Sequence, residues 1–174
     1  LATGMAGYLA KGADWRLNPV QRDMLVQSRG VGFRCTGAAT CLMGDRTGAF
    51  TGIAFAGDSH MGRYGFMLDT YLAGKHRSAR MLTDGWCAPL LYWQSGNVGK
   101  CGDGTFGQAF AALLQDDTIH TVVFAAEWAN YASGYREGSN TTAFDFTGDA
   151  DRNTDYAKNA SEFRKAFDAT LAAF

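Results

Sequence analysis

Residues 51–60 read Thr-Gly-Ile-Ala-Phe-Ala-Gly-Asp-Ser-His, and this stretch decides the fold. The first six residues are mostly apolar without alternation, which predicts a short strand covered on both faces. After His60 the period becomes helical and ends at Gly74. The expected apolar face of this helix comprises Met61, Tyr64, Met67, Leu68, Tyr71 and Leu72. A strand, a tight turn and a helix form the first half of a βαβ unit.

The alternation continues along the chain. A weaker strand is predicted at 80–83, a helix at 106–114, a buried parallel strand at 118–126 and a helix at 155–174, with a polar loop between Trp128 and Asn153. Alternating strands and helices predict an α/β fold with a parallel sheet. Three readable strands make a thin sheet, so we expect that the C-terminal part of the fold is missing.

The domain organisation is predicted as two parts. Residues 1–34 form a lead-in segment with a short helix that begins at Asn18-Pro19, since Asn caps helices and Pro suits their first position. Residues 35–174 form the main domain.

Composition excludes several classes of function. The chain has 174 residues, of which 47% are apolar and 19% charged, enough for one domain with a core. A net charge of −1 without a basic run argues against nucleic acid or an anionic membrane as partner. No stretch approaches the roughly 20 apolar residues of a membrane helix. No cluster suggests a metal ion or an organic cofactor.

Four cysteines stand at Cys35, Cys41, Cys87 and Cys101. The even count favours disulfides, and the sequence alone leaves all three pairings open. A zinc site is the competing interpretation, but neither neighbouring pair has zinc-ligand spacing. Disulfides would indicate an oxidising compartment.

Ser59 occupies the turn between the first clear strand and its helix. Ligands bind at the carboxyl ends of parallel strands, and a helix N-terminus points N–H groups at such a site, ready to stabilise an oxyanion. Gly57 would let the chain turn sharply, and Asp58 would cap the helix. The alternative is that Asp58 and Ser59 are only capping residues of an ordinary turn.

Residues 55–60, Phe-Ala-Gly-Asp-Ser-His, resemble block I of the SGNH (GDSL-like) hydrolase superfamily. The Gly-Asp-Ser-His variant is similar to that of SGNH domains attached to bacterial integral-membrane acyltransferases. The loop at Cys87-Ala88-Pro89 and the segment Val122–Tyr131 resemble the same subgroup. This resemblance implies a three-layer, flavodoxin-like fold with a central parallel sheet, and it suggests Cys101 as the partner of Cys87.

The resemblance also implies roles for site residues. Ser59 would be the nucleophile, with Asp58 and His60 as supporting neighbours, and the N–H groups of Ser59 and Gly85 would form an oxyanion hole with Asn130. The alternative for Asn130 is a loop cap, which is the more common role of such a residue. In the superfamily the Ser is activated by a His that lies in an Asp-x-x-His motif near the C-terminus. We expect no such motif in this chain, and none of His60, His76 and His120 is placed to activate Ser59. We therefore expect the family's His and Asp beyond residue 174 and this chain alone to be inactive.

Aromatic residues gather in the two loops expected at the catalytic edge. Trp86, Trp128 and Tyr131 are candidates for binding sugar rings, together with Tyr92, Trp93 and Tyr135. The alternative is that they pack beneath long loops.

The resulting hypothesis is a periplasmic O-acyltransferase domain. It would receive an acyl group, expected to be acetyl, from an integral-membrane acyltransferase partner or domain and pass it from Ser59 to a polysaccharide acceptor. The alternatives are a carbohydrate or lipid esterase of the same superfamily and a carbohydrate-binding relative that has lost catalysis.

Overall fold

The computed structural model describes residues 18–19, 40–85, 87–91, 101, 104–133 and 156–174. All of these except Asn18 and Pro19 belong to a compact unit that spans Phe33–Phe174. Pro19 is helical, and the remainder of the predicted N-terminal helix lies outside the described residues, as does the predicted boundary between residues 34 and 35.

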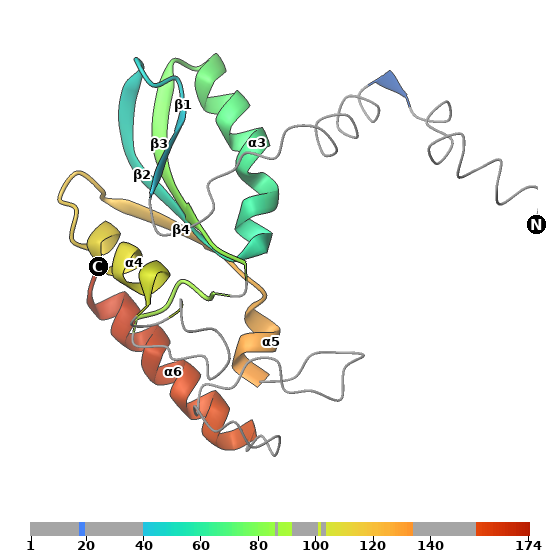
Figure 1. The fold of residues 1–174 in the computed structure, drawn as a ribbon, viewed down its shortest axis with the longest axis vertical. Coiled ribbons are helices and arrows are strands. Elements are labelled where there is room, and N and C mark those ends of the chain that lie inside the picture. The colour runs from blue at the N-terminus through green and yellow to red at the C-terminus, as the bar shows by residue number, and fades with distance from the viewer. Residues whose placement is uncertain (1–17, 20–39, 86, 92–100, 102–103, 134–155) are drawn as a thin grey trace, which may run out of the picture. The chain divides into compact units, whose positions relative to one another are not determined.

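Between residues 49 and 125 the strands and helices alternate as predicted (Figure 1). The strands are β1 (Cys41–Gly44), β2 (Ala49–Gly57), β3 (Arg77–Thr83) and β4 (Thr121–Ala125). The helices are α3 (Ser59–Gly74), α4 (Thr105–Leu114), α5 (Trp128–Ser133) and α6 (Tyr156–Ala172).

The strands form one sheet in the order β1-β3-β2-β4. β2 is parallel to both of its neighbours, β3 and β4, which confirms the predicted parallel sheet. β1 was not predicted and runs antiparallel to β3. Its four residues, Cys-Leu-Met-Gly, are too few to show a period, so only the pairing with β3 reveals the strand.

Side chains of β2 alternate between two apolar layers. Ile53 and Phe55 face α3 on one side of the sheet. Ala54 and Ala56 face the other side, and their small size leaves room for Phe110 of α4 and for the layer that includes α6. The predicted three-layer α/β architecture is therefore confirmed.

The predicted apolar face of α3 is only partly buried. Met61 and Leu72 are buried and Leu68 packs against the same layer. The other three members point to solvent: Tyr64, Met67 and Tyr71 are 51%, 56% and 62% exposed. At about 100° per residue the two groups lie on different lines along the helix, and the sheet contacts only the first.

Two further predictions need correction near the end of the sheet. β4 is an edge strand of the described sheet, and Val123 is 41% exposed, so this strand is not covered on both faces. The predicted polar loop begins instead as helix α5, which packs on α6. The last predicted helix is confirmed as α6, although Leu171 at its end is 54% exposed.

A disulfide joins Cys87 and Cys101, with an S–S distance of 2.07 Å. Both residues are buried in the layer beneath α4 and α6, so the bridge anchors the long connection between β3 and α4. This confirms the pairing that the resemblance implied. Cys41 is also disulfide-bonded, and Cys35 lies outside the described residues.

Neither a membrane-spanning helix nor a metal cluster emerges from the part of the chain that the structure describes. None of its helices is both long and apolar enough to cross a bilayer. No three His, Cys, Asp or Glu side chains of that part gather as metal ligands would.

Candidate active site

The candidate nucleophile lies at the carboxyl edge of the parallel strands. Gly57, the last residue of β2, pairs with Thr83 of β3 and with Ala125 of β4, so three strands end at one level. The Asp84 N–H donates to the Gly57 carbonyl at 3.2 Å, which keeps the chain after β3 beside the turn after β2. Ser59 and Gly85 are thereby brought to the same edge.

Gly57 is required for close packing. A Cβ at this position would lie 1.9 Å from the Ala125 carbonyl oxygen and 2.7 Å from the Met61 Cβ. Its φ is not positive, unlike those of Gly44 and Gly52. Glycine is therefore required at this position by the nearness of β4 and α3 and not by a left-handed backbone.

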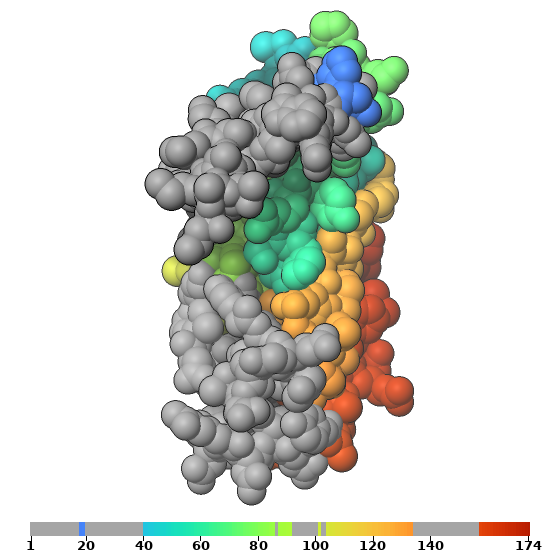
Figure 2. Space-filling view, turned by 90° about the vertical axis from the view of Figure 1, so that its right-hand side faces the viewer, coloured from blue at the N-terminus to red at the C-terminus, as the bar shows by residue number. Residues whose placement is uncertain are grey.

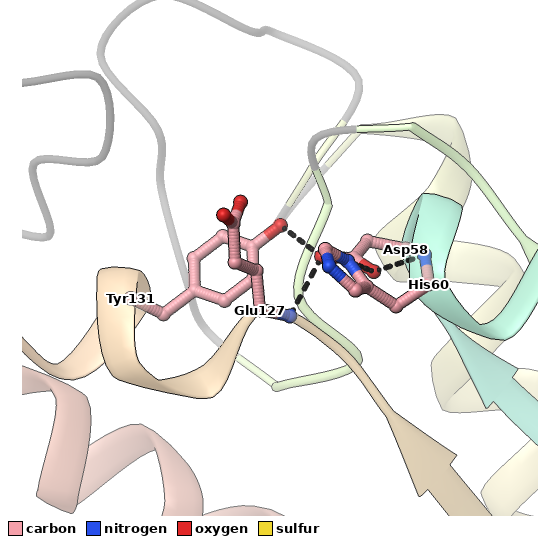
Figure 3. Close-up of polar contacts among 4 residues, drawn as sticks. All are labelled: Asp58, His60, Glu127 and Tyr131. Atoms are coloured by element: carbon pink, nitrogen blue, oxygen red, sulfur yellow. Dashed lines mark hydrogen bonds and ion pairs between the residues drawn. The ribbon is translucent and has the colours of Figure 1, made fainter. Parts of the chain in front are cut away.

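Asp58 caps α3 and is 2% exposed. Its Oδ1 accepts from the His60 N–H at 2.8 Å and lies 3.0 Å from His60 Nδ1. Its Oδ2 accepts from the Glu127 N–H and from the Tyr131 hydroxyl, each at 3.0 Å. Figure 3 shows these contacts converging on one carboxylate. The predicted capping role is confirmed, and the second oxygen adds a link to the end of β4 that was not predicted.

Tyr131 is the buried partner of that carboxylate. Burial raises the pKa of the Tyr131 hydroxyl well above its ordinary value of 10.0, and the charges of Asp58 and Glu127 act in the same direction. The hydroxyl therefore stays protonated and donates to Asp58. Its position, four residues after Glu127 at helical spacing, is the only sequence signal that could have suggested this role.

Ser59 is exposed at the first position of α3. Its N–H belongs to the first turn, where backbone donors have no partner within the helix. Among the described residues, none forms a hydrogen bond with the Ser59 hydroxyl. Asp58 thus serves the helix and its neighbours, while Ser59 is left open to a substrate.

All three histidines lie in the described part of the chain. His60 Nδ1 faces Asp58, and its side chain is 51% exposed. His76 lies at the far end of α3, where Nδ1 is 3.1 Å from Asp45 Oδ2 and the side chain is 87% exposed. Of these two, His60 is the histidine that shares the edge with Ser59, and His120 belongs to the pair described next.

The expectation that the chain contains no Asp-x-x-His motif is wrong, because Asp117 and His120 have that spacing. They nevertheless precede β4, and the His120 N–H donates to the Gly52 carbonyl at 2.9 Å. Gly52 lies five residues before Gly57, or about 16 Å along an extended strand. This pair is at the opposite end of the sheet from Ser59 and does not activate it there.

The other predicted site residues take varied positions. Tyr131 is 0% exposed, so the prediction that it binds substrate at the surface is not supported. Trp128 packs edge-on against Phe163 and Phe167, at centroid distances of 6.3 and 6.0 Å, in agreement with the packing alternative. Asn130 lies in α5, and Trp86 is outside the described residues, as are Tyr92, Trp93 and Tyr135.

The chain is similar to a known family of protein domains. The family model described as the SGNH domain (fused to AT3 domains) matches residues 27–174. The match includes the whole edge from Gly57 to Tyr131. Neither the curated proteins nor the solved structures contain a match.

Gly57→Ala is expected to lower the free energy of unfolding by about 1–3 kcal/mol, as overpacking a tight site does. The added methyl would push β4 or α3 away from the turn. Gly74→Ala is the matched control, because a Cβ there meets nothing within 4 Å. Urea unfolding measures both variants. Equal stability of Gly57→Ala and the wild type would contradict the close-packing explanation.

Tyr131→Phe is expected to lower the free energy of unfolding by about 1.5–3 kcal/mol, because the buried Asp58 carboxylate loses a hydrogen-bond donor. The cost depends on pH. As pH rises through 10.0, the unfolded tyrosine ionises while the folded one does not, so the stability that Tyr131 contributes is present below that pH and is lost above it.

Denaturant titrations between pH 7 and 11 measure the difference in free energy of unfolding between the wild type and Tyr131→Phe. Tyr64→Phe, at an exposed position, controls for general effects of removing a hydroxyl. A difference between Tyr131→Phe and the wild type that stays constant above pH 10.0 would refute the assignment.

Proposed function

Because the chain belongs to the family of SGNH domains that are fused to AT3 domains, we propose that it is an O-acyltransferase domain whose nucleophile is Ser59. The observation that carries this proposal is the exposed Ser59 at the N-terminus of α3, on the carboxyl edge of three parallel strands. The neighbouring Asp58 is fully engaged in hydrogen bonds, which separates the structural role of the turn from its chemical role.

The reaction would proceed in two steps. The Ser59 oxygen attacks the carbonyl carbon of an acyl donor, its proton passes to a general base, and the donor's leaving group departs. The base passes that proton to the leaving group. A polysaccharide hydroxyl then attacks the acyl-serine ester and loses its proton to the base, which returns a proton to the Ser59 oxygen as the acyl group leaves. We take the acyl group to be acetyl.

The developing oxyanion needs donors that are already in place. The Ser59 N–H lies at the start of α3, where the helix dipole also favours negative charge. Gly85 follows β3 at the same edge, where a Cβ would meet nothing within 4 Å, and its N–H is the proposed second donor. The proposed third donor is the Asn130 side chain from α5.

The proposed setting is the periplasm. The Cys87–Cys101 disulfide supports an oxidising compartment. The fusion to AT3 domains that characterises the family supports a membrane acyltransferase as the source of the acyl group. The proposed acceptor is a cell-envelope polysaccharide.

Reaction of the full-length gene product with a fluorophosphonate probe tests the nucleophile. Ser59 is expected to carry the adduct, and Ser59→Ala is expected to lose labelling and to lower turnover by at least about 10⁴-fold. Ser161→Ala, at an exposed serine of α6, is the control and should behave as the wild type.

Peptide mapping locates the adduct, and release of acetate is compared with transfer to a de-O-acetylated polysaccharide. An unlabelled Ser59 would overturn the nucleophile assignment. Acetate release without any transfer would instead assign the domain as an esterase.

A further inference from the structure

The exposed side of α3 carries a stripe that begins beside the nucleophile. His60, Tyr64, Met67 and Tyr71 follow at intervals of four, three and four residues. At about 100° per residue the four positions lie in one sector of the helix surface that is about 60° wide. The side chain of His60 is 51% exposed, and Tyr64, Met67 and Tyr71 are 51%, 56% and 62% exposed. Figure 2 looks onto the side of the molecule on which α3 lies.

The stripe is fixed at the end that lies beside Ser59. Asp58 Oδ1 holds His60 Nδ1 at 3.0 Å, and Asp58 is itself anchored by Glu127 and Tyr131. Nδ1 therefore faces the buried carboxylate, and Nε2 is the ring nitrogen that remains for a ligand. At the other end Lys75 Nζ lies 5.9 Å from the centroid of the Tyr71 ring.

The width of the stripe indicates the kind of partner. It is one side chain wide, with the exposed Arg63 on one flank and the buried Met61 and Leu72 on the other. A stable protein interface uses roughly 20–30 residues on each side, far more than this stripe offers. A net charge of −1 gives no attraction to an anionic membrane.

The chemistry of the stripe suits a sugar polymer. Tyrosine presents an apolar ring face for the C–H groups of a sugar and a hydroxyl for its polar edge. Tyr64 and Tyr71 are seven residues apart, which is about 10 Å along the helix axis, so they would contact successive parts of an extended chain. The line ends at His60, next to Ser59.

We infer that this stripe, His60–Tyr64–Met67–Tyr71, is the track on which the acceptor polysaccharide lies. The inference rests on the proposed function, because it names the surface that guides the acceptor to Ser59. His60 Nε2 hydrogen-bonds the sugar unit at the reacting end, and the two tyrosine rings stack on units farther along.

Binding of fragments of defined length tests the track. The probe is the surface polysaccharide of cells that carry this protein, de-O-acetylated and cut into one- to eight-unit fragments. Titration calorimetry on Ser59→Ala protein measures affinity without turnover. Affinity should increase with fragment length, and Tyr64→Ala and Tyr71→Ala should each weaken binding of the longest fragment about 2- to 10-fold.

The order of the residues gives the test its specificity. His60→Ala should weaken fragments of every length, whereas Tyr71→Ala should affect only fragments long enough to reach it. A merely structural role of these side chains would not produce this length dependence. Leu171→Ala, at an exposed apolar position on α6, should bind every fragment as the parent does.

Other outcomes would overturn the inference. One is unchanged affinity of the Tyr64→Ala/Tyr71→Ala double variant for the longest fragment. Another is an equal loss of affinity at all fragment lengths in Tyr71→Ala. The third is an effect of these substitutions confined to self-association or to pelleting with phosphatidylglycerol vesicles. A failure of the proposed function is distinguishable, because it appears as an unlabelled Ser59 whatever the fragments do.

Discussion

The carboxylate of Asp58 is the constraint on which the edge of this sheet depends. A buried carboxylate is tolerated only where donors satisfy its oxygens, and Asp58 receives them from the first turn of α3, from the end of β4 and from α5. The turn after β2 and the turn after β4 are therefore held together by one side chain. Ser59, next in sequence, is left at the exposed start of a fixed helix, which is the position that a nucleophile needs.

Much of the fold could be predicted because its signals are local. The apolar run before Gly57 and the helical period after Ser59 each lie within one element, as do Phe163 and Phe167, which are four residues apart in α6. What could not be predicted depends on neighbours distant in sequence. β1 exists as a strand through its pairing with β3, and α5 is a helix that packs on α6. The period of the α3 sequence predicted which residues are apolar. It did not predict how narrow a face of the helix the sheet covers.

The candidate site also has parts that local sequence predicts and parts that depend on distant residues. Ser59 and the capping role of Asp58 follow from the turn itself. The partners of Asp58 Oδ2 lie 69 and 73 residues away in the chain, so their roles required the sheet topology. For Tyr131 the sequence left sugar binding and packing beneath a loop both open, because residue type does not distinguish a buried hydroxyl donor from an exposed ring. The half of the α3 face that stayed exposed, unexplained by the core, is the observation from which the acceptor track follows.

Amide hydrogen exchange in Asp58→Ala tests the central claim most directly. The N–H groups of His60 and Glu127, which both donate to Asp58, should lose protection together, although they belong to different elements. The Asp84 N–H, which donates to the Gly57 carbonyl, should stay protected and show that the edge remains folded. An unchanged Glu127 amide in the variant would contradict the account, because the two turns would then be held together by something other than Asp58.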